Sequence, residues 1–226
     1  MAITRLRALG VTDGTLTNTQ INASAAIAKT KLAALDIVNA DVNASAAIVS
    51  SKLGTLSGAQ FPTGSIIQTL QANKTDTQLI ESASFVDILT QAITPSATSS
   101  GILVMAYLSV NGNGHYDVRV TRNDVNIENA SGTGVGIGNQ VGSNRTRSTA
   151  HFYDVTNFNT TYSSNTPCIV LLDYPDTTSA VTYKIKAASP YDGTNYDVDI
   201  NRQHSDSDTS WAATTITTLT VQEIKG

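Results

Sequence analysis

The sequence is poor in cysteine and charge, and each shortage excludes a class of protein. One cysteine in 226 residues, Cys168, rules out an internal disulfide framework and a multi-cysteine zinc site. We expect its thiol to be a small buried hydrophobic group. Charged residues make up 14% of the chain, and a net charge of -4 lacks the basic footprint of a nucleic-acid-binding protein. No run approaches the ~18 apolar residues of a membrane span, so we expect a soluble protein without a standard export signal.

Groups for acid–base catalysis are also scarce. The glutamates and histidines of the chain are Glu81, Glu128, Glu223, His115, His151 and His204. No nucleophile elbow or phosphate-binding Gly-Lys-Ser/Thr loop occurs, and the alternating glycines of residues 132–138 lack dinucleotide-loop spacing. The sequence therefore predicts a protein that is not an enzyme and needs no cofactor.

The N-terminal part contains an internal repeat. Residues 16–36 align without gaps on residues 37–57, and the hexapeptide NASAAI recurs unchanged in both. Each unit reads as an extended stretch followed by a short helix with an Asn or Ser cap. Each helix carries a narrow stripe at helical spacing, formed by Ala25, Ala28, Leu32 and Leu35 in the first unit and Ala46, Val49, Leu53 and Leu56 in the second.

Such a stripe is too small to stabilise the repeat alone. Four small side chains contribute only a few kcal/mol at ~25 cal/mol per Å², less than the ordering cost of the unit. We therefore expect the stripe to pack against copies of itself around an axis, or against a larger surface. A flexible alanine-rich linker is the alternative.

Beyond a breaker cluster at residues 57–64 the pattern changes to short strands, which places the domain boundary between residues 60 and 61. The first 60 residues are net basic and residues 61–226 net acidic. Nine strands are predicted, at residues 65–70, 85–88, 102–110, 116–121, 151–155, 168–172, 180–187, 196–200 and 214–224. Their short spacing predicts a mainly β protein, with an antiparallel β-sandwich of jelly-roll type at residues 61–226.

Two strands carry further information. Residues 102–108 are apolar without alternation, as in a central strand covered on both faces. Residues 181–186 alternate between apolar and polar side chains, which fits one face in water. Residues 126–149, rich in Gly and Asn, predict a surface loop.

Several stretches resemble tail-fibre and related virion fibre proteins of tailed bacteriophages. They are residues 13–27 (DGTLTNTQINASAAI), 36–41 (DIVNAD), 64–68 (GSIIQ), 93–100 (ITPSATSS), 172–173 (LD), 178–184 (TSAVTYK), 215–217 (TIT) and 223–224 (EI). Residues 112–166 match nothing in that family. The motifs that carry the resemblance are structural, so the resemblance implies no catalytic residues in this chain.

The resemblance implies a homotrimer in the virion, assembled in the host cytoplasm, with a slender N-terminal segment that attaches to other virion proteins. The head at residues 61–226 would then bind a glycan or protein on the host surface. A capsid fibre or decoration protein is the alternative. A glycan depolymerase and a bacterial β adhesin are lesser ones.

Candidate binding residues are a basic island and aromatic residues near strand ends. Guanidinium groups bind sulfate, phosphate or sugar carboxylates, and exposed aromatic rings stack on sugars. The predicted receptor-binding residues are Arg145, Arg147, Tyr191, Tyr196 and Trp211. The alternative for the arginines is a solvated loop or an ion pair with Asp on a neighbouring subunit, and the alternative for the aromatic residues is that they cover the edges of the core. The acidic oxygens of residues 192–208 fit either turn-forming residues or a calcium loop, although their order does not match an EF-hand.

Overall fold

The computed structural model divides the chain into two units, residues 1–54 and 55–226, and each is taken by itself. The structure describes residues 45–46, 61–112, 114–129, 131–154, 165–189, 196–204, 207–210 and 212–226. Apart from residues 45–46, the repeats and their predicted helices lie outside the described residues, as does the packing stripe except for Ala46, which is exposed. The predicted boundary near residue 60 stays a prediction.

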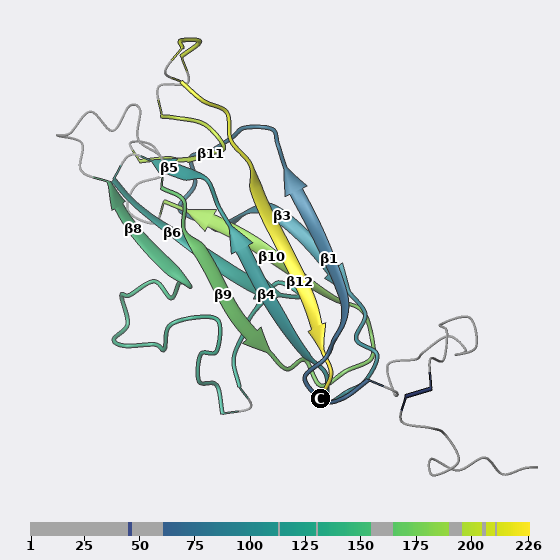
Figure 1. Cartoon of the computed structure of the whole chain (residues 1–226). Coiled ribbons are helices and arrows are strands. Elements are labelled where there is room, and N and C mark those ends of the chain that lie inside the picture. The colour runs from purple at the N-terminus through teal and green to yellow at the C-terminus, as the bar shows by residue number, and fades with distance from the viewer. Residues whose placement is uncertain are drawn as a thin grey trace, which may run out of the picture. The chain divides into compact units, whose positions relative to one another are not determined.

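The described part of the second unit is mainly β, and its sheets are antiparallel, as the sequence predicts (Figure 1). The strands are β1 (Ile66–Lys74), β2 (Gln78–Ile80), β3 (Val86–Ile93), β4 (Gly101–Tyr107), β5 (Val110–Gly112), β6 (Gly114–Arg122), β7 (Val125–Asn126), β8 (Ala150–Asp154), β9 (Cys168–Asp173), β10 (Val181–Ala188), β11 (Val198–Ile200) and β12 (Thr217–Ile224). Among the described residues no helix is long and apolar enough to span a membrane.

The strands form three sheets. Sheet I has the order β1-β12-β4-β9, and sheet II has the order β3-β10-β6-β7 with β8 also paired to β6. Sheet III is the short set β2-β11-β5. The main pairings are nested along the chain, because β1 pairs with β12, β3 with β10, β4 with β9 and β6 with β8.

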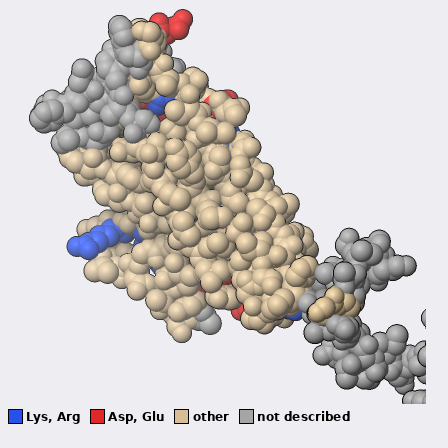
Figure 2. All heavy atoms as spheres, in the orientation of Figure 1, with Lys and Arg blue, Asp and Glu red and all other residues tan. Residues whose placement is uncertain are grey.

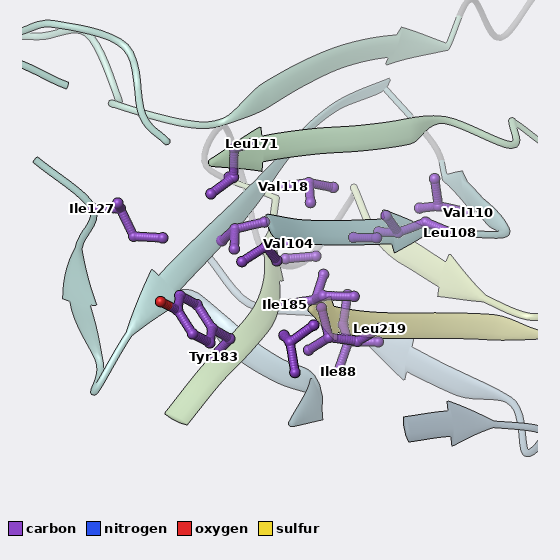
Figure 3. Packing of buried hydrophobic residues seen from close by; sticks show 14 of the residues in the cluster. Ile88, Val104, Leu108, Val110, Val118, Ile127, Leu171, Tyr183, Ile185 and Leu219 are labelled. Carbon is purple, nitrogen blue, oxygen red and sulfur yellow. The ribbon is translucent and has the colours of Figure 1, made fainter. Parts of the chain in front are cut away.

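Sheets I and II contribute to one hydrophobic core. Val104 and Leu219 of sheet I and Val118 and Ile185 of sheet II are fully buried and belong to one cluster (Figure 3). On β10 the buried residues alternate with half-buried lysines and a threonine, which confirms the prediction of one wet face. The wet face carries an ion-pair network in which Lys184 and Lys186 each contact Asp87 and Asp124.

Three details differ from the prediction. The run at 102–110 breaks after Tyr107 into β4 and β5, and the last two predicted strands begin later, at Val198 and Thr217. The short strands β2 and β7 were not predicted. The expectation that Cys168 is buried is wrong, because strand alternation on β9 turns Ile169 and Leu171 inward and leaves Cys168 exposed.

Candidate functional site

A cluster of polar side chains lies on the outer face of sheet II, where β6 pairs with β8. The antiparallel register places His115 opposite Tyr153 and Asp117 opposite His151. Because side chains alternate along a strand, these four share one face. Tyr116 lies on the opposite face, where its ring stacks on Phe152 of the core at 5.1 Å between centroids.

The cluster is a chain of hydrogen bonds that runs from the interior to the surface. The Asp117 carboxylate, only 3% exposed, accepts a hydrogen bond from Nδ1 of His151 at 2.9 Å. The Nε2 atom of His151 lies 3.3 Å from Nδ1 of His115. The Tyr153 ring packs on the His115 ring at 4.3 Å and holds its orientation. His151 remains 52% exposed, so the chain ends at solvent.

His115, Asp117 and His151 line an open cleft of about 650 Å³ together with residues 144–146 and 148 of the predicted surface loop. Its walls are His115, Asp117, His151, Asn144, Arg145, Thr146 and Ser148. Apart from Asp117, the charged side chain in this wall is Arg145, which is exposed. The cleft therefore offers a guanidinium, two imidazoles and several neutral hydrogen-bonding groups to a ligand.

The two predicted arginines have different surroundings. Arg145 lines the cleft, whereas Arg147 donates from Nε to the Gly138 carbonyl at 2.7 Å and forms an ion pair with Glu128. The Arg147 carbonyl also accepts a hydrogen bond from Nε of Arg119 at 3.2 Å. Arg147 thus fastens the predicted surface loop, and Arg145 is the member of the pair that faces a ligand site.

The predicted aromatic residues fall elsewhere. Tyr196 is half-buried and packs on the backbone at Gly114, where a Cβ atom would meet its ring at 2.1 Å. The positive φ of +82° at Gly114 also favours glycine there. Tyr191 and Trp211 lie outside the described residues.

A second cluster, near the acidic run of the sequence, consists of Asp197, Asp199 and His204. Nδ1 of His204 lies 3.0 Å from the fully buried Asp199 and 3.3 Å from Asp197. Burial raises the pKa of Asp199 in spite of hydrogen bonds from His204 and Arg202, which lower it. The Arg202 guanidinium already contacts Asp199 at 2.6 Å, so a cation occupies this carboxylate. The geometry favours a structural ion-pair cluster over the calcium loop.

The outer face of sheet I, unlike that of sheet II, carries no charged side chains on its described strands. Figure 2 shows the centre of this face free of Lys, Arg, Asp and Glu. One half is a Thr, Gln and Asn surface on β1 and β12, and the other is apolar. The apolar half consists of Leu103, Met105, Tyr107, Cys168, Val170, Leu172 and Tyr174. Val170 and Tyr174 are 59% and 58% exposed.

Two comparisons with known proteins found no relative of this chain. No protein-family model matches the chain, and no curated protein matches it.

Proposed function

We propose that the chain is a non-enzymatic virion protein of a tailed bacteriophage, a homotrimeric tail fibre whose β unit binds an anionic glycan on the host surface. The observation that carries the binding role is the open cleft with exposed Arg145 beside His115 and His151. A guanidinium beside imidazole, amide and hydroxyl groups suits a sulfate, phosphate or sugar carboxylate. Three such clefts on one trimer would strengthen weak single contacts through avidity.

The strand pairing supports the architectural part of the proposal. Nested antiparallel pairs distributed over two sheets are typical of a jelly-roll β-sandwich, a fold used for lectin and virion domains. Together with the resemblance of the repeat to virion fibres, this favours a head that is displayed on a particle. A capsid fibre or decoration protein has the same architecture and is the second candidate.

Localisation on the particle tests the proposal and separates the two candidates. An antibody raised against the full chain, detected with gold by electron microscopy, is expected to label the tail of intact particles. Label over the capsid would contradict the tail-fibre assignment and support the capsid fibre or decoration protein. Particles without label would contradict both.

Removal of the exposed cation is expected to weaken glycan binding. Arg145→Ala should raise the Kd for a sulfated or carboxylated glycan by about 10-fold or more, because a charge-assisted hydrogen bond contributes roughly 1.5–3 kcal/mol. Surface plasmon resonance on an immobilised glycan measures this change. Lys74→Ala on β1, where the lysine is paired with Asp76, makes the same change of net charge on the other main sheet and is the control for net charge. Equal losses in both variants would show general electrostatic attraction and no role for the cleft.

The uncharged face of sheet I supports the homotrimer. We expect a second copy of the chain to cover it, because an uncharged face is where copies of an acidic chain approach without repulsion. The sequence of β4 supports this expectation, because it lacks the polar alternation of a strand with one face in water. Tyr107 is nevertheless exposed in the described unit, so its cover would come from another copy. Apolar patches of this kind on a sheet mark interaction sites.

A charge in this face is expected to weaken self-association. Val170→Asp should raise the subunit dissociation constant by at least about 100-fold, since it places a carboxylate in an apolar contact. Sedimentation equilibrium measures this constant, and Thr182→Asp on the wet face of β10 is the control.

Cys168 lies on the same face of sheet I as Val170 and provides a second test. Its thiol should react with a thiol reagent slowly in the assembly and faster in Val170→Asp. Equal rates in both would show that the face is free, and the association would then be assigned to the N-terminal segment at residues 1–60.

A further inference from the structure

The two imidazole rings of the cleft are spaced like a pair of metal ligands. Nδ1 of His115 and Nε2 of His151 face each other at 3.3 Å. Zinc–nitrogen bonds of about 2.0–2.1 Å in tetrahedral geometry place two histidine nitrogens about 3.4 Å apart. The separation of the two nitrogens therefore already matches that of two zinc ligands, and a rotation of the rings that turns both lone pairs to one side of the N–N line completes the site.

A buried carboxylate already orients one of the two ligands. Asp117 accepts the hydrogen bond from Nδ1 of His151, so in the neutral ring the proton is on Nδ1 and the lone pair is on Nε2. That lone pair is directed toward His115. Histidines that bind metals usually donate their second ring nitrogen to a carboxylate in this manner, which fixes the tautomer and raises the basicity of the ligand.

The strands hold the pair in place. His115 and His151 are diagonal neighbours across the β6–β8 ladder, so their separation is set by backbone hydrogen bonds and not by a loop. The Tyr153 ring packs on His115, and Asp117 anchors His151. Ligands whose rotamers are held by packing and by a second layer of hydrogen bonds lose little entropy on binding a metal.

From this geometry we propose that His115 and His151 bind one divalent transition-metal ion of the zinc type, with Asp117 as the carboxylate that orients His151. Imidazole nitrogen suits Zn²⁺ and its neighbours better than Mg²⁺ or Ca²⁺. On binding, Nδ1 of His115 loses its proton while Nε2 takes one from water, so both rings stay neutral and no electron is transferred. The remaining coordination positions open into the cleft and accept water or a ligand oxygen.

This site differs from the Asp197, Asp199 and His204 cluster, although that cluster contains more potential ligands. There the Arg202 guanidinium occupies one oxygen of Asp199 and His204 the other. A metal ion would have to displace a cation that is already paired. At His115 and His151 it replaces the hydrogen bond between the two rings and displaces no charged side chain from His151 Nε2. The inference does not depend on the proposed function, because it concerns only the two rings and their carboxylate.

Isothermal titration of the full chain with ZnCl₂ tests the proposal. We expect one ion per chain with a micromolar Kd, at least about 30-fold weaker binding in His115→Ala, and about 10- to 100-fold weaker binding in Asp117→Asn. His204→Ala is the matched control and should bind as the unsubstituted chain does. X-ray absorption of the zinc-loaded protein should show two imidazole nitrogens at about 2.0 Å.

Two outcomes overturn the inference. One is zinc binding that survives in His115→Ala and His151→Ala but is lost in His204→Ala. The other is the absence of saturable binding up to millimolar zinc. Circular dichroism of each variant excludes misfolding, and His151, half exposed, tolerates substitution without a cavity. Should His115→Ala unfold, the Asp117→Asn affinity and the absorption spectrum still decide the question.

Discussion

Glu223→Gln is expected to destabilise the β unit by about 3 kcal/mol at pH 7. The Glu223 carboxylate is fully buried and accepts hydrogen bonds from the Ser96 N–H, the Ser96 hydroxyl and the Ser100 hydroxyl, each at 2.6 Å. The Gln68 amide donates to its other oxygen at 2.7 Å. A glutamine keeps one acceptor oxygen and replaces the other by an NH2 donor, which would face either the serine donors or the Gln68 amide. Each buried group left unsatisfied costs about 1–3 kcal/mol. Urea denaturation followed by circular dichroism measures the loss.

The pH dependence identifies the carboxylate as the cause. Burial raises the pKa of Glu223, but the hydrogen bonds from Ser100, Ser96 and Gln68 outweigh it and hold the pKa below its ordinary value. A lowered pKa in the folded state stabilises the protein fully above the unfolded pKa, about 4.3, and the stabilisation is lost as the pH falls through the folded pKa. The difference between the two proteins should therefore shrink below about pH 4. A constant difference down to acid would contradict this account.

The matched control is Glu81→Gln, which makes the same substitution at an exposed position just after β2. Surface substitutions of this kind change stability by at most about 0.5 kcal/mol. A loss as large at Glu81 as at Glu223 would mean that the hydrogen-bonded pocket has no special role.

Arg122→Met is expected to cost about 3–4 kcal/mol, because it leaves a buried carboxylate without its cation. Asp173, on β9 of sheet I, has a side chain only 4% exposed. Nη1 of Arg122, on β6 of sheet II, lies 2.8 Å from both of its oxygens. The Tyr183 hydroxyl, on β10, donates to the same carboxylate at 2.7 Å. These contacts join the two main sheets, so their loss should lower the urea midpoint of the whole unit.

A double substitution separates the lost pair from lost packing. Arg122→Met with Asp173→Leu removes both charges and should recover most of the stability, as buried pairs replaced by apolar groups usually do. Burial and the neighbouring Asp173 raise the pKa of Tyr183, so its hydroxyl remains a donor at ordinary pH. Lys184→Met, in the solvated network of sheet II, is expected to have little effect. A double variant as unstable as the single one would refute the electrostatic explanation.

The part of the fold that periodicity encodes could be predicted from the sequence. The alternation of Val181, Tyr183 and Ile185 with polar residues gave the correct faces of β10. The apolar run of β4 correctly indicated a strand in the middle of a sheet, but the expectation that both of its faces are covered is not met within the described residues, because Tyr107 is 42% exposed. The strands β2 and β7 were missed because two or three residues carry no measurable period. Cys168 was misplaced because the general burial of cysteine was weighed above its outward position on β9.

The candidate site was predicted only in part, for a related reason. Arg145 was found from its charge, but His115, Asp117 and His151 come together only through the β6–β8 register. Nothing local in the sequence sets a register between strands that a long loop separates. A usable signal did exist, since each histidine begins a His-x-Asp or His-x-Tyr triplet that places two polar side chains on one strand face.

The nested pairing of the strands has a consequence for the folding kinetics of the chain. The outermost pair, β1 and β12, joins residues that are very far apart in the chain, and the hydrogen bond between Gln68 and Glu223 spans 155 positions. Pairings this remote pay loop-closure entropy before any contact compensates for it, and they make folding slow. Because β12 lies between β1 and β4, sheet I stays incomplete until β12 has been synthesised, although β4 and β9 can pair before that. Until then the apolar strand β4 has an unpaired edge on the β12 side, and an unpaired apolar edge is the kind of surface from which partly folded chains aggregate.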